Sequence, residues 1–426
     1  MGRLNSQADS LLRHGYSKDK RPDLLQYRQM LGTLDPTGIP LVSETLAGNG
    51  ADDSLYWPAW QRMAKVIGHK LFVFLADCKA AAIATRATIA DAGGIYCFPL
   101  PLTGQNPDLL KQWVLNPPSA SVDIRLPRQE EDEPAVGKGF EIELGKTWFN
   151  PDTNKLVKWH ERYLVAYSHV LATAQIRGLH ERLDKAETAL KKLKKSPGED
   201  LEVLNAQVAA ILKRHRVKEF LIVTTTIETN IRTSYVKKGR PSAKSPTKEV
   251  TQIELTLESE RQILAIAEAE QLAGWRLYVT NAPIARLSLN QAISYYRDQW
   301  IVERGFHRFK RGQLPALPIY FQNQDRIVGL MFLLTLALRV FTLIEFIVRL
   351  ALQTSQQKLA GLYAGNPKRA TERPSAEQLL KAFDNLNLYL FPENSIVVTT
   401  LSALHRQILF FAQIARIHLP PTSQAP

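Results

Sequence analysis

A long apolar run from Ile327 to Leu352 sets the first constraint on what this chain can fold into. The run is long enough to cross a membrane as a single helix. Arg339, Glu345 and Arg349 interrupt it, however, and charges at those depths are costly in lipid. The run therefore predicts a buried helix with charged edges, and we expect no membrane partner.

Residues 38–100 alternate between segments of strand length and helix length. "LLQYRQMLGTLD" and "GIPLVSETLAG" are short apolar runs bounded by Pro, Gly or Asp, as in a pair of strands, and "YWPAWQRMAKVI" has a helical period. "KLFVFLAD" is continuously apolar, which predicts a central strand buried on both faces and ending at Asp77. An alanine-rich helix that stops at two glycines and the strand "IYCFPLPL" follow. The segment indicates an α/β layer fold.

The composition changes between Pro101 and Gly274. "TWFNPDTNKLVKWHERYLVAYS" alternates like an antiparallel meander, and residues of about 170–215 have two helical patterns separated by "SPGE", which predicts an αα-hairpin. Two β-rich segments then flank the basic loop "VKKGRPSAKSPTKE". Beyond them we expect the strand "GWRLYVTNAP", one helix from Leu289 to Arg311, the apolar helix, a capped helix at Ser375, a strand near "SIVVTT" and a last helix.

Net charge points to a polyanionic partner. Lysine and arginine number 54 against 41 aspartates and glutamates, so the formal charge is +13. Such an excess favours phosphate contacts with nucleic acid, although charge that serves only solubility would look the same. Cys78 and Cys97 are too few for a disulfide framework, and the first residues lack the apolar core of a signal peptide. We expect a cytoplasmic, nucleoid-associated protein.

The most basic stretch, "SYYRDQWIVERGFHRFKRG", surrounds Glu303. We place it on one helix at about 100° per residue. Four polar side chains then share an arc of about 60°: Tyr296, Gln299, Glu303 and Lys310. They would present a hydroxyl, an amide, a carboxylate and an ammonium on one face. A solvated stripe in which Glu303 pairs with His307 or Lys310 would give the same spacing.

Asp77 is the second candidate, because open α/β sheets carry functional residues at strand ends. An aspartate between a strand and a helix is also a common N-cap, worth about 1 kcal/mol, and the sequence leaves both roles open. With Glu303 it would offer hard oxygen ligands on a phosphate-binding surface, as metal-assisted phosphoryl transfer requires. The two residues therefore predict a Mg²⁺ (or Mn²⁺) site.

The sequence resembles the DDE transposases of bacterial insertion sequences, specifically the insertion-sequence-four group and its larger relatives. The helix signature of that group is Y-x2-R-x3-E-x6-K. Tyr296, Glu303 and Lys310 match it, whereas Gln299 replaces the arginine and Arg297 stands two positions earlier. "GYSKDKRPDLLQY", "FLADCKA", "GWRLYVTN" and "LPIYFQNQDRIVGLMFLL" are also similar to the group, so the resemblance extends over nearly the whole chain.

This resemblance implies an α/β fold with an RNase H-like, mixed-sheet core. The core would occupy residues 1–100 and 275–355, with an inserted, mainly β domain at 101–274 and a helical segment at 356–426. Asp77 and Glu303 would be the second and third acidic ligands of two divalent ions that activate water, and later the freed 3′-OH, for attack on DNA phosphodiesters.

The resemblance also implies the partners, which are double-stranded DNA of the transposon ends and the target, and a second copy of the chain in a homodimer. Six residues are implied to bind the DNA: Tyr296, Arg297, Gln299, Arg304, Lys310 and Arg311.

The family's first acidic ligand has no evident counterpart here. In the family it ends an apolar strand shortly before the segment that resembles "GYSKDKRPDL". Asp9 is the one carboxylate before Gly15, and its neighbours are polar; Asp19, Asp23 and Asp35 come after the start of the motif. We therefore expect a chain that begins inside the core, without its first strand, and whose chemistry is impaired.

Two classes of function remain open at this point. One is a metal-dependent transposase that cleaves and joins DNA strands. The other is a catalytically inactive DNA-binding remnant that occupies transposon ends or pairs with an intact copy. Both predict salt-sensitive DNA affinity, and only the first predicts metal-dependent nicking. A stand-alone nuclease or an RNA-binding protein is a weaker third reading, and no GxGxxG, Walker, HExxH or GxSxG motif supports other enzymes.

Overall fold

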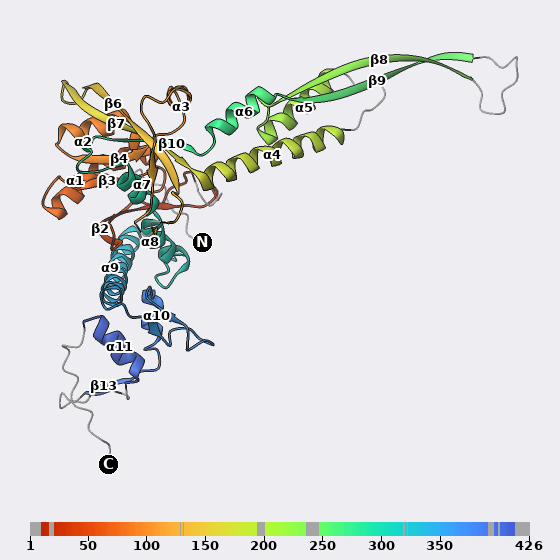
Figure 1. The fold of residues 1–426 in the computed structure, drawn as a ribbon. Coiled ribbons are helices and arrows are strands. Elements are labelled where there is room, and N and C mark those ends of the chain that lie inside the picture. The colour runs from red at the N-terminus through yellow and green to blue at the C-terminus, as the bar shows by residue number, and fades with distance from the viewer. Residues whose placement is uncertain are drawn as a thin grey trace. The chain divides into compact units, whose positions relative to one another are not determined.

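The computed structural model describes residues 10–16, 21–127, 129–130, 132–193, 201–235, 247–317, 320–321, 323–390, 396–398 and 401–413. The chain divides into two compact units, and each is described by itself (Figure 1). The helical unit comprises Met1–Phe74, Ala82–Ile95 and Tyr295–Pro426. The sheet unit comprises Leu75–Ala81 and Tyr96–Ser294. Asp9, Asp19 and most of the basic loop after Tyr235 lie outside the described residues.

The helical unit begins with an antiparallel hairpin and ends in helices. Its strands are β1 (Tyr27–Leu34), β2 (Ile39–Ala47) and the short pairs β11 (Leu359–Ala360) with β12 (Ala370–Thr371) and β13 (Leu388–Leu390) with β14 (Ile396–Val398). Its helices are η1 (Asp53–Leu55), α1 (Tyr56–Ile67), α2 (Ile83–Asp91), α8 (Trp300–Arg311), α9 (Gln324–Thr354), α10 (Ala376–Lys381) and α11 (Ala403–Phe411). The predicted strand pair is thus confirmed, with Tyr27 opposite Ala47 and Leu34 opposite Ile39.

Helix α9 is the long apolar run, and it packs on β2 through one face. Ile327, Met331 and Leu338 are buried on that face. Arg339 donates from Nε to the carbonyl of Pro40 at 2.7 Å, so this charge is used inside the unit. The charged residue that interrupts the run therefore fixes the helix to the hairpin.

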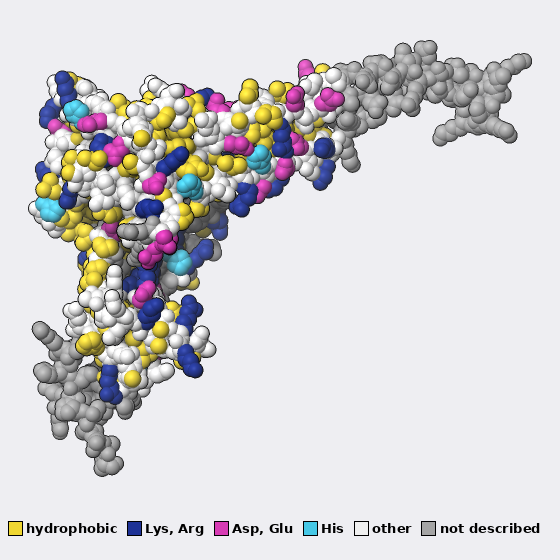
Figure 2. All heavy atoms as spheres, viewed as in Figure 1, with side chains coloured by type: hydrophobic (Ala, Val, Ile, Leu, Met, Phe, Trp, Pro, Cys, Tyr) yellow, Lys and Arg dark blue, Asp and Glu magenta, His cyan; other side chains and the backbone are white. Residues whose placement is uncertain are grey.

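The opposite face of α9 is exposed, and the prediction of a buried helix is correct for only half of its circumference. Phe332 is 61% and Leu333 62% exposed, and hydrophobic side chains are visible along this helix in Figure 2. Only 28% of its most apolar window is buried, and by length and composition alone α9 could cross a membrane. Hydropathy along the run is too uniform to tell the two faces apart.

The sheet unit is built on a six-stranded mixed sheet in the order β3-β4-β10-β7-β6-β5. The strands are β3 (Val73–Leu75), β4 (Ile95–Pro99), β5 (Val122–Ile124), β6 (Gly137–Asn150), β7 (Lys155–Ser168) and β10 (Trp275–Thr280). The first residues of β3 and β4, through Phe74 and Ile95, are counted with the helical unit. Helices α3 (Asn106–Leu115) and α7 (Leu289–Arg297) accompany them, and α7 runs on into the helical unit. The buried side chains of Phe98, Leu164 and Val279 contribute to the core.

Strand β3 corrects one prediction. The apolar run before Asp77 was expected to form a central strand, but it supplies a three-residue strand at one end of the sheet order. Phe74 is buried, whereas Leu71 is 61% exposed. A continuous apolar run does not distinguish a central strand from an edge strand when its flanking residues extend past the sheet.

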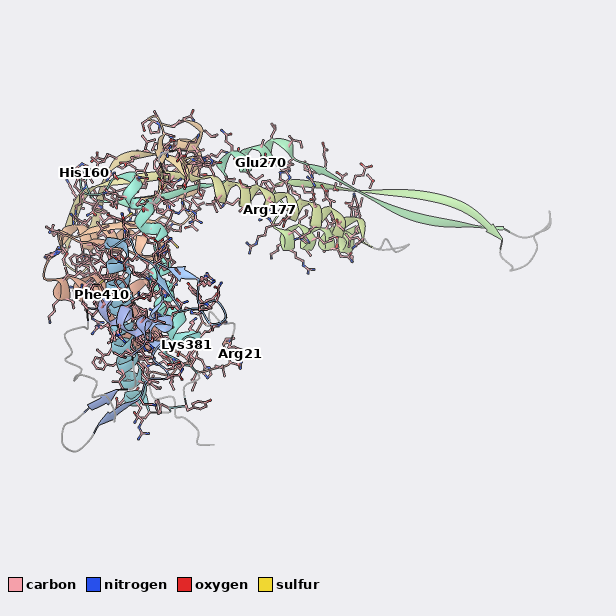
Figure 3. All side chains as sticks on the ribbon, turned by 60° about the horizontal axis from the view of Figure 1, so that its bottom comes forward. Arg21, His160, Arg177, Glu270, Lys381 and Phe410 are labelled. Carbon is pink, nitrogen blue, oxygen red and sulfur yellow. The ribbon has the colours of Figure 1, made fainter. Side chains whose placement is uncertain are left out.

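A helical hairpin and a long ribbon extend from this sheet (Figure 1). Helices α4 (His169–Lys191) and α5 (Leu201–His215) pack through Leu183, Leu190 and Val208. Strands β8 (Leu221–Tyr235) and β9 (Thr247–Arg261) form the antiparallel ribbon, and α6 (Ile263–Leu272) returns to the sheet. Arg177 on α4 and Glu270 on α6 lie on this hairpin and its return helix (Figure 3). The mixed sheet and its helices fit the expected RNase H-like core.

Candidate active site and nucleic-acid interface

The helix predicted from Leu289 to Arg311 is broken in two. Helix α7 ends at Arg297, Asp298 and Gln299 form a turn, and α8 begins at Trp300. The amides of Asp298 and Gln299 donate to carbonyls three residues back, at 3.1 and 3.3 Å, instead of four. The 60° arc calculated for one straight helix therefore applies only to the signature residues within α8, and Tyr296 belongs to the preceding helix.

The outer face of α8 carries the candidate acid. Glu303, His307 and Lys310 are exposed at successive turns of the helix, and Arg311 is exposed beside them. Within the described part of the chain, no ion pair joins Glu303 to His307, and Lys310 has an interaction of its own. Glu303 thus stands exposed among basic side chains on a helix whose other face is packed.

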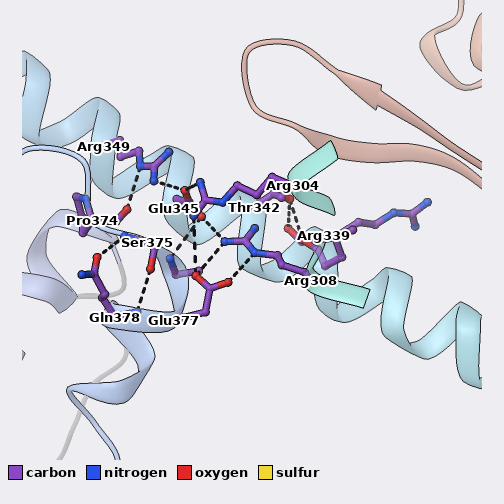
Figure 4. Close-up of polar contacts among 12 residues, drawn as sticks. Arg304, Arg308, Arg339, Thr342, Glu345, Arg349, Pro374, Ser375, Glu377 and Gln378 are labelled. Carbon is purple, nitrogen blue, oxygen red and sulfur yellow. Dashed lines mark hydrogen bonds and ion pairs between the residues drawn. The ribbon is translucent and has the colours of Figure 1, made fainter. Parts of the chain in front are cut away.

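The inner face of α8 turns two arginines toward α9 and α10 (Figure 4). Arg304 forms an ion pair with Glu345 of α9, and its Nη2 lies 3.9 Å from a carboxylate oxygen of Glu377 of α10. Arg308 donates from Nη2 to Glu345 at 2.6 Å and from Nε to Glu377 at 2.7 Å. The sequence predicted Arg304 as a DNA contact, and in the structure its guanidinium is paired with acids of α9 and α10.

The α8–α9–α10 charge cluster, which we define as Arg304, Arg308, Glu345, Arg349 and Glu377, is mostly buried. The Arg308 side chain is 3% and the Glu345 side chain 5% exposed, and the other three are between 24 and 29%. Burial alone would lower the pKa of Arg308, but hydrogen bonds to Glu377 and Glu345 raise it above its ordinary value. Burial lowers the pKa of Arg349 to about 10 against the attraction of Glu345.

The two acids of this cluster were not predicted from the sequence as partners of the helix signature. Glu345 was visible only as a charge that interrupts the apolar run, and its spacing from Arg349 is that of an i,i+4 pair. Glu377 follows the capped start of α10, where Ser375 accepts from the amide of Gln378. Neither signal indicates a contact with α8.

Asp77 lies between β3 and the short helix η2 (Cys78–Ala81), directly before its first residue. Its Oδ1 accepts a hydrogen bond from the amide of Lys79 at 3.0 Å, and its carbonyl accepts from Ala80 at 3.1 Å. The capping role that the sequence left open is therefore present. The side chain is exposed, and a carboxylate has lone pairs for several further bonds, so capping does not exclude metal binding.

Asp77 belongs to the sheet unit and Glu303 to the helical unit. No group of three or more His, Cys, Asp or Glu side chains arranged to hold a metal occurs among the described residues. Both candidates are nevertheless exposed carboxylates, which are the hard oxygen ligands that Mg²⁺ and Mn²⁺ prefer. The chemistry of the donors fits a divalent ion.

A second acidic pair lies at the start of α8 in the helical unit. Asp35 is in the turn between β1 and β2, and Asp298 is in the turn between α7 and α8. Burial, and then the negative charge of Asp298, raise the pKa of Asp35 above its ordinary value. Gly38 in the same turn has a positive φ of 71°, and a Cβ there would lie 2.6 Å from Ile301 of α8. The hairpin turn and α8 are therefore in close contact.

Comparison with known proteins identifies the family. The family model described as "Transposase DDE domain" matches residues 7–340, which include Asp77, Glu303 and the whole of α8. A search of curated proteins finds no match. Because the family match covers well over half of the 426 residues, the chain belongs to the DDE-domain transposases.

Proposed function

We propose that this chain is the DNA transposase of an insertion sequence, similar to the insertion-sequence-four group, and that it cleaves and joins DNA at the ends of its element. The observation that carries the proposal is Glu303, which is exposed on α8 among basic residues inside the segment that matches the family.

The proposal assigns the metal to Asp77 and Glu303. Mg²⁺ or Mn²⁺, when bound there, would supply the positive charge that stabilises a phosphodiester under attack and favours deprotonation of the attacking water or 3′-OH. The role of the chain itself is to present two carboxylates. The bond from the Lys79 amide restrains the Asp77 carboxylate, and the packing of α8 fixes the direction of Glu303.

Exposed and partly exposed residues around α8 would bind the DNA backbone. Lys310, Arg297 and Arg311 offer cations, while Tyr296 and Gln299 offer neutral donors. Arg304 is set apart from this group by its ion pairs. The DNA would be the double-stranded element ends and the target, held by two copies of the chain in the cytoplasm. We assign α9 to packing rather than to a membrane, because Arg339, Glu345 and Arg349 are all bonded within the unit.

The test is metal-dependent nicking of DNA that carries the ends of the element. The wild-type chain is compared with Glu303→Gln and with the matched control Glu372→Gln, which removes an exposed glutamate outside the charge cluster. The proposal is supported if nicking is specific for the ends and requires Mg²⁺ or Mn²⁺. This nicking should be lost in Glu303→Gln and kept in Glu372→Gln. Salt-sensitive binding of end DNA without nicking would instead favour the inactive DNA-binding remnant, and neither binding nor nicking would refute both.

A further inference from the structure

Basic side chains on the two faces of α8 meet different surroundings. At about 100° per residue, Glu303, His307 and Lys310 fall within one arc of about 60°, while Arg304 and Arg308 are centred about 110° around the helix from the middle of that arc. A rotation of the helix by one residue would turn an arginine to where the acid now points. A polyanion such as DNA attracts every nearby cation, so something must decide which face of α8 it meets.

The charge cluster holds the two arginines on one face of α8. Glu345 accepts from Arg304, from Arg308, from Arg349 and, at 3.4 Å, from the amide of Ala376. Glu377 accepts from both Nε and Nη2 of Arg308. The two acids belong to different helices, so the guanidinium of Arg308 is bound from two directions and cannot follow a rotation of α8.

Apolar packing encloses the same contact. The Arg308 guanidinium lies 5.7 Å from the centre of the Phe341 ring of α9. Phe309, the next residue of α8, is 3% exposed and packs with Met331 and Leu338 of α9. Gly305 faces the same side, and a Cβ there would stand 3.4 Å from the Leu338 side chain. Low exposure makes these ion pairs stronger than they would be in water.

We propose that Glu345 and Glu377 are positioning residues. They hold Arg304 and Arg308 on the inner face of α8, so that DNA meets Glu303 and Lys310 and not these two arginines. The inference rests on the proposed function, since it assumes that the outer face of α8 meets DNA. It assigns to the two acids a role outside the signature residues of the helix.

The experiment measures how the affinity for end DNA depends on salt, without metal, for the full-length wild type, Arg304→Gln and Arg297→Gln. Each phosphate contact contributes about 0.9 to the slope of log K against log salt. Arg297 is exposed and serves as the matched control, because the same substitution removes the same charge. We expect Arg297→Gln to lower the magnitude of the slope by about 0.9 and Arg304→Gln to leave it unchanged.

Two further variants test the role of the acids. Glu345→Gln should steepen the slope by about 0.9, because Arg304 becomes available to phosphate, and the double variant Glu345→Gln with Arg304→Gln should return to the wild-type slope. Where Glu345→Gln does not fold, Arg304→Gln alone decides the question. In the nicking assay, Arg304→Gln should lower the maximal rate about tenfold while the affinity for DNA changes less than twofold. A loss of folded protein would instead lower the apparent binding capacity and the rate together.

The inference is overturned if Arg304→Gln lowers the slope as much as Arg297→Gln does, since Arg304 would then contact phosphate in the wild type. It is also overturned if Arg304→Gln nicks at the wild-type rate. If the wild-type chain shows no salt-dependent binding of end DNA, the proposed function fails and the inference fails with it. Equal slopes for all variants of a wild type that does bind would refute the inference and would leave the DNA-binding function standing.

Discussion

Replacement of Glu345 by glutamine should destabilise the helical unit far more than the same replacement at the surface. The cluster has three arginines and two glutamates, so its formal charge is +1, and Glu345→Gln raises it to +2. Arg308, which is 3% exposed, would keep only Glu377 as a partner. Removal of one partner from a buried ion pair costs about 3–5 kcal/mol.

We expect the lower end of that range, about 3 kcal/mol, because Arg304 and Arg349 are about a quarter exposed and water would screen them. Glu44→Gln is the matched control in the same unit. Glu44 pairs with Arg62, whose side chain is 45% exposed, and such surface pairs contribute less than about 1 kcal/mol.

Urea unfolding, followed by circular dichroism, measures both variants against the wild type. Curves with equal slopes in urea allow the midpoints to be converted into differences in the free energy of unfolding. A loss of about 3 kcal/mol for Glu345→Gln and less than about 1 kcal/mol for Glu44→Gln would support the reasoning. Equal losses would show that the cluster contributes no more than a surface pair, and the structural argument would be wrong.

Three further predictions concern single side chains. Burial acts to raise the pKa of Glu377, but hydrogen bonds from Arg308 outweigh it and lower the pKa to about 2. The ionised carboxylate therefore stabilises the fold at pH values above its ordinary pKa of 4.5, and this contribution is lost as the pH falls toward 2. Between pH 4.5 and 2, the free energy of unfolding should depend more steeply on pH for the wild type than for Glu377→Gln. Burial and Asp298 raise the pKa of Asp35, so the ionised form is disfavoured in the folded state. Asp35→Asn should therefore raise the melting temperature at pH 7 and change it little below pH 3.8. A lower melting temperature of the variant at pH 7 would contradict this reasoning. Lys310→Gln should weaken binding of end DNA and reduce its salt slope by about 0.9, as fluorescence anisotropy would show, whereas an unchanged slope would remove Lys310 from the interface.

Many of the elements follow from local patterns. Helix α1 has the bounds of the predicted segment, from Tyr56 to Ile67, because its apolar period and the left-handed Gly68 after it mark both the face and the end. The cap of α10 at Ser375 is a capping box, which depends on residues three apart. Such signals are local, so one sequence is enough to find them.

The errors have a tertiary or geometric origin. The chain has no proline or glycine from Leu289 up to Gly305, so the composition does not predict the turn at Asp298 and Gln299. The indole of Trp300 donates to Asp298 at 3.3 Å, a contact that fits a turn rather than a continuing helix. The edge position of β3 and the exposed side of α9 likewise depend on which neighbours the fold supplies.

The residues of the candidate site also divide into those that a local sequence pattern predicts and those that depend on tertiary packing. Glu303 stands out in the sequence because an acid within a basic stretch is unusual, and the helix signature adds to it. The partners of Arg304 and Arg308 do not stand out, because Glu345 lies 41 residues after the first and Glu377 lies 69 residues after the second. A single sequence carries no signal for pairs at that separation, and only the packing of α8 on α9 and α10 brings them together.

The most direct test of the central claim replaces Mg²⁺ with Fe²⁺ and, with ascorbate and peroxide, maps where the chain is cut by radicals formed at the bound ion. The account predicts cuts near Asp77 and near Glu303, with the cuts near Glu303 lost in Glu303→Gln and retained in Glu372→Gln. Cuts at neither place would contradict metal binding by these carboxylates and with it the proposed chemistry.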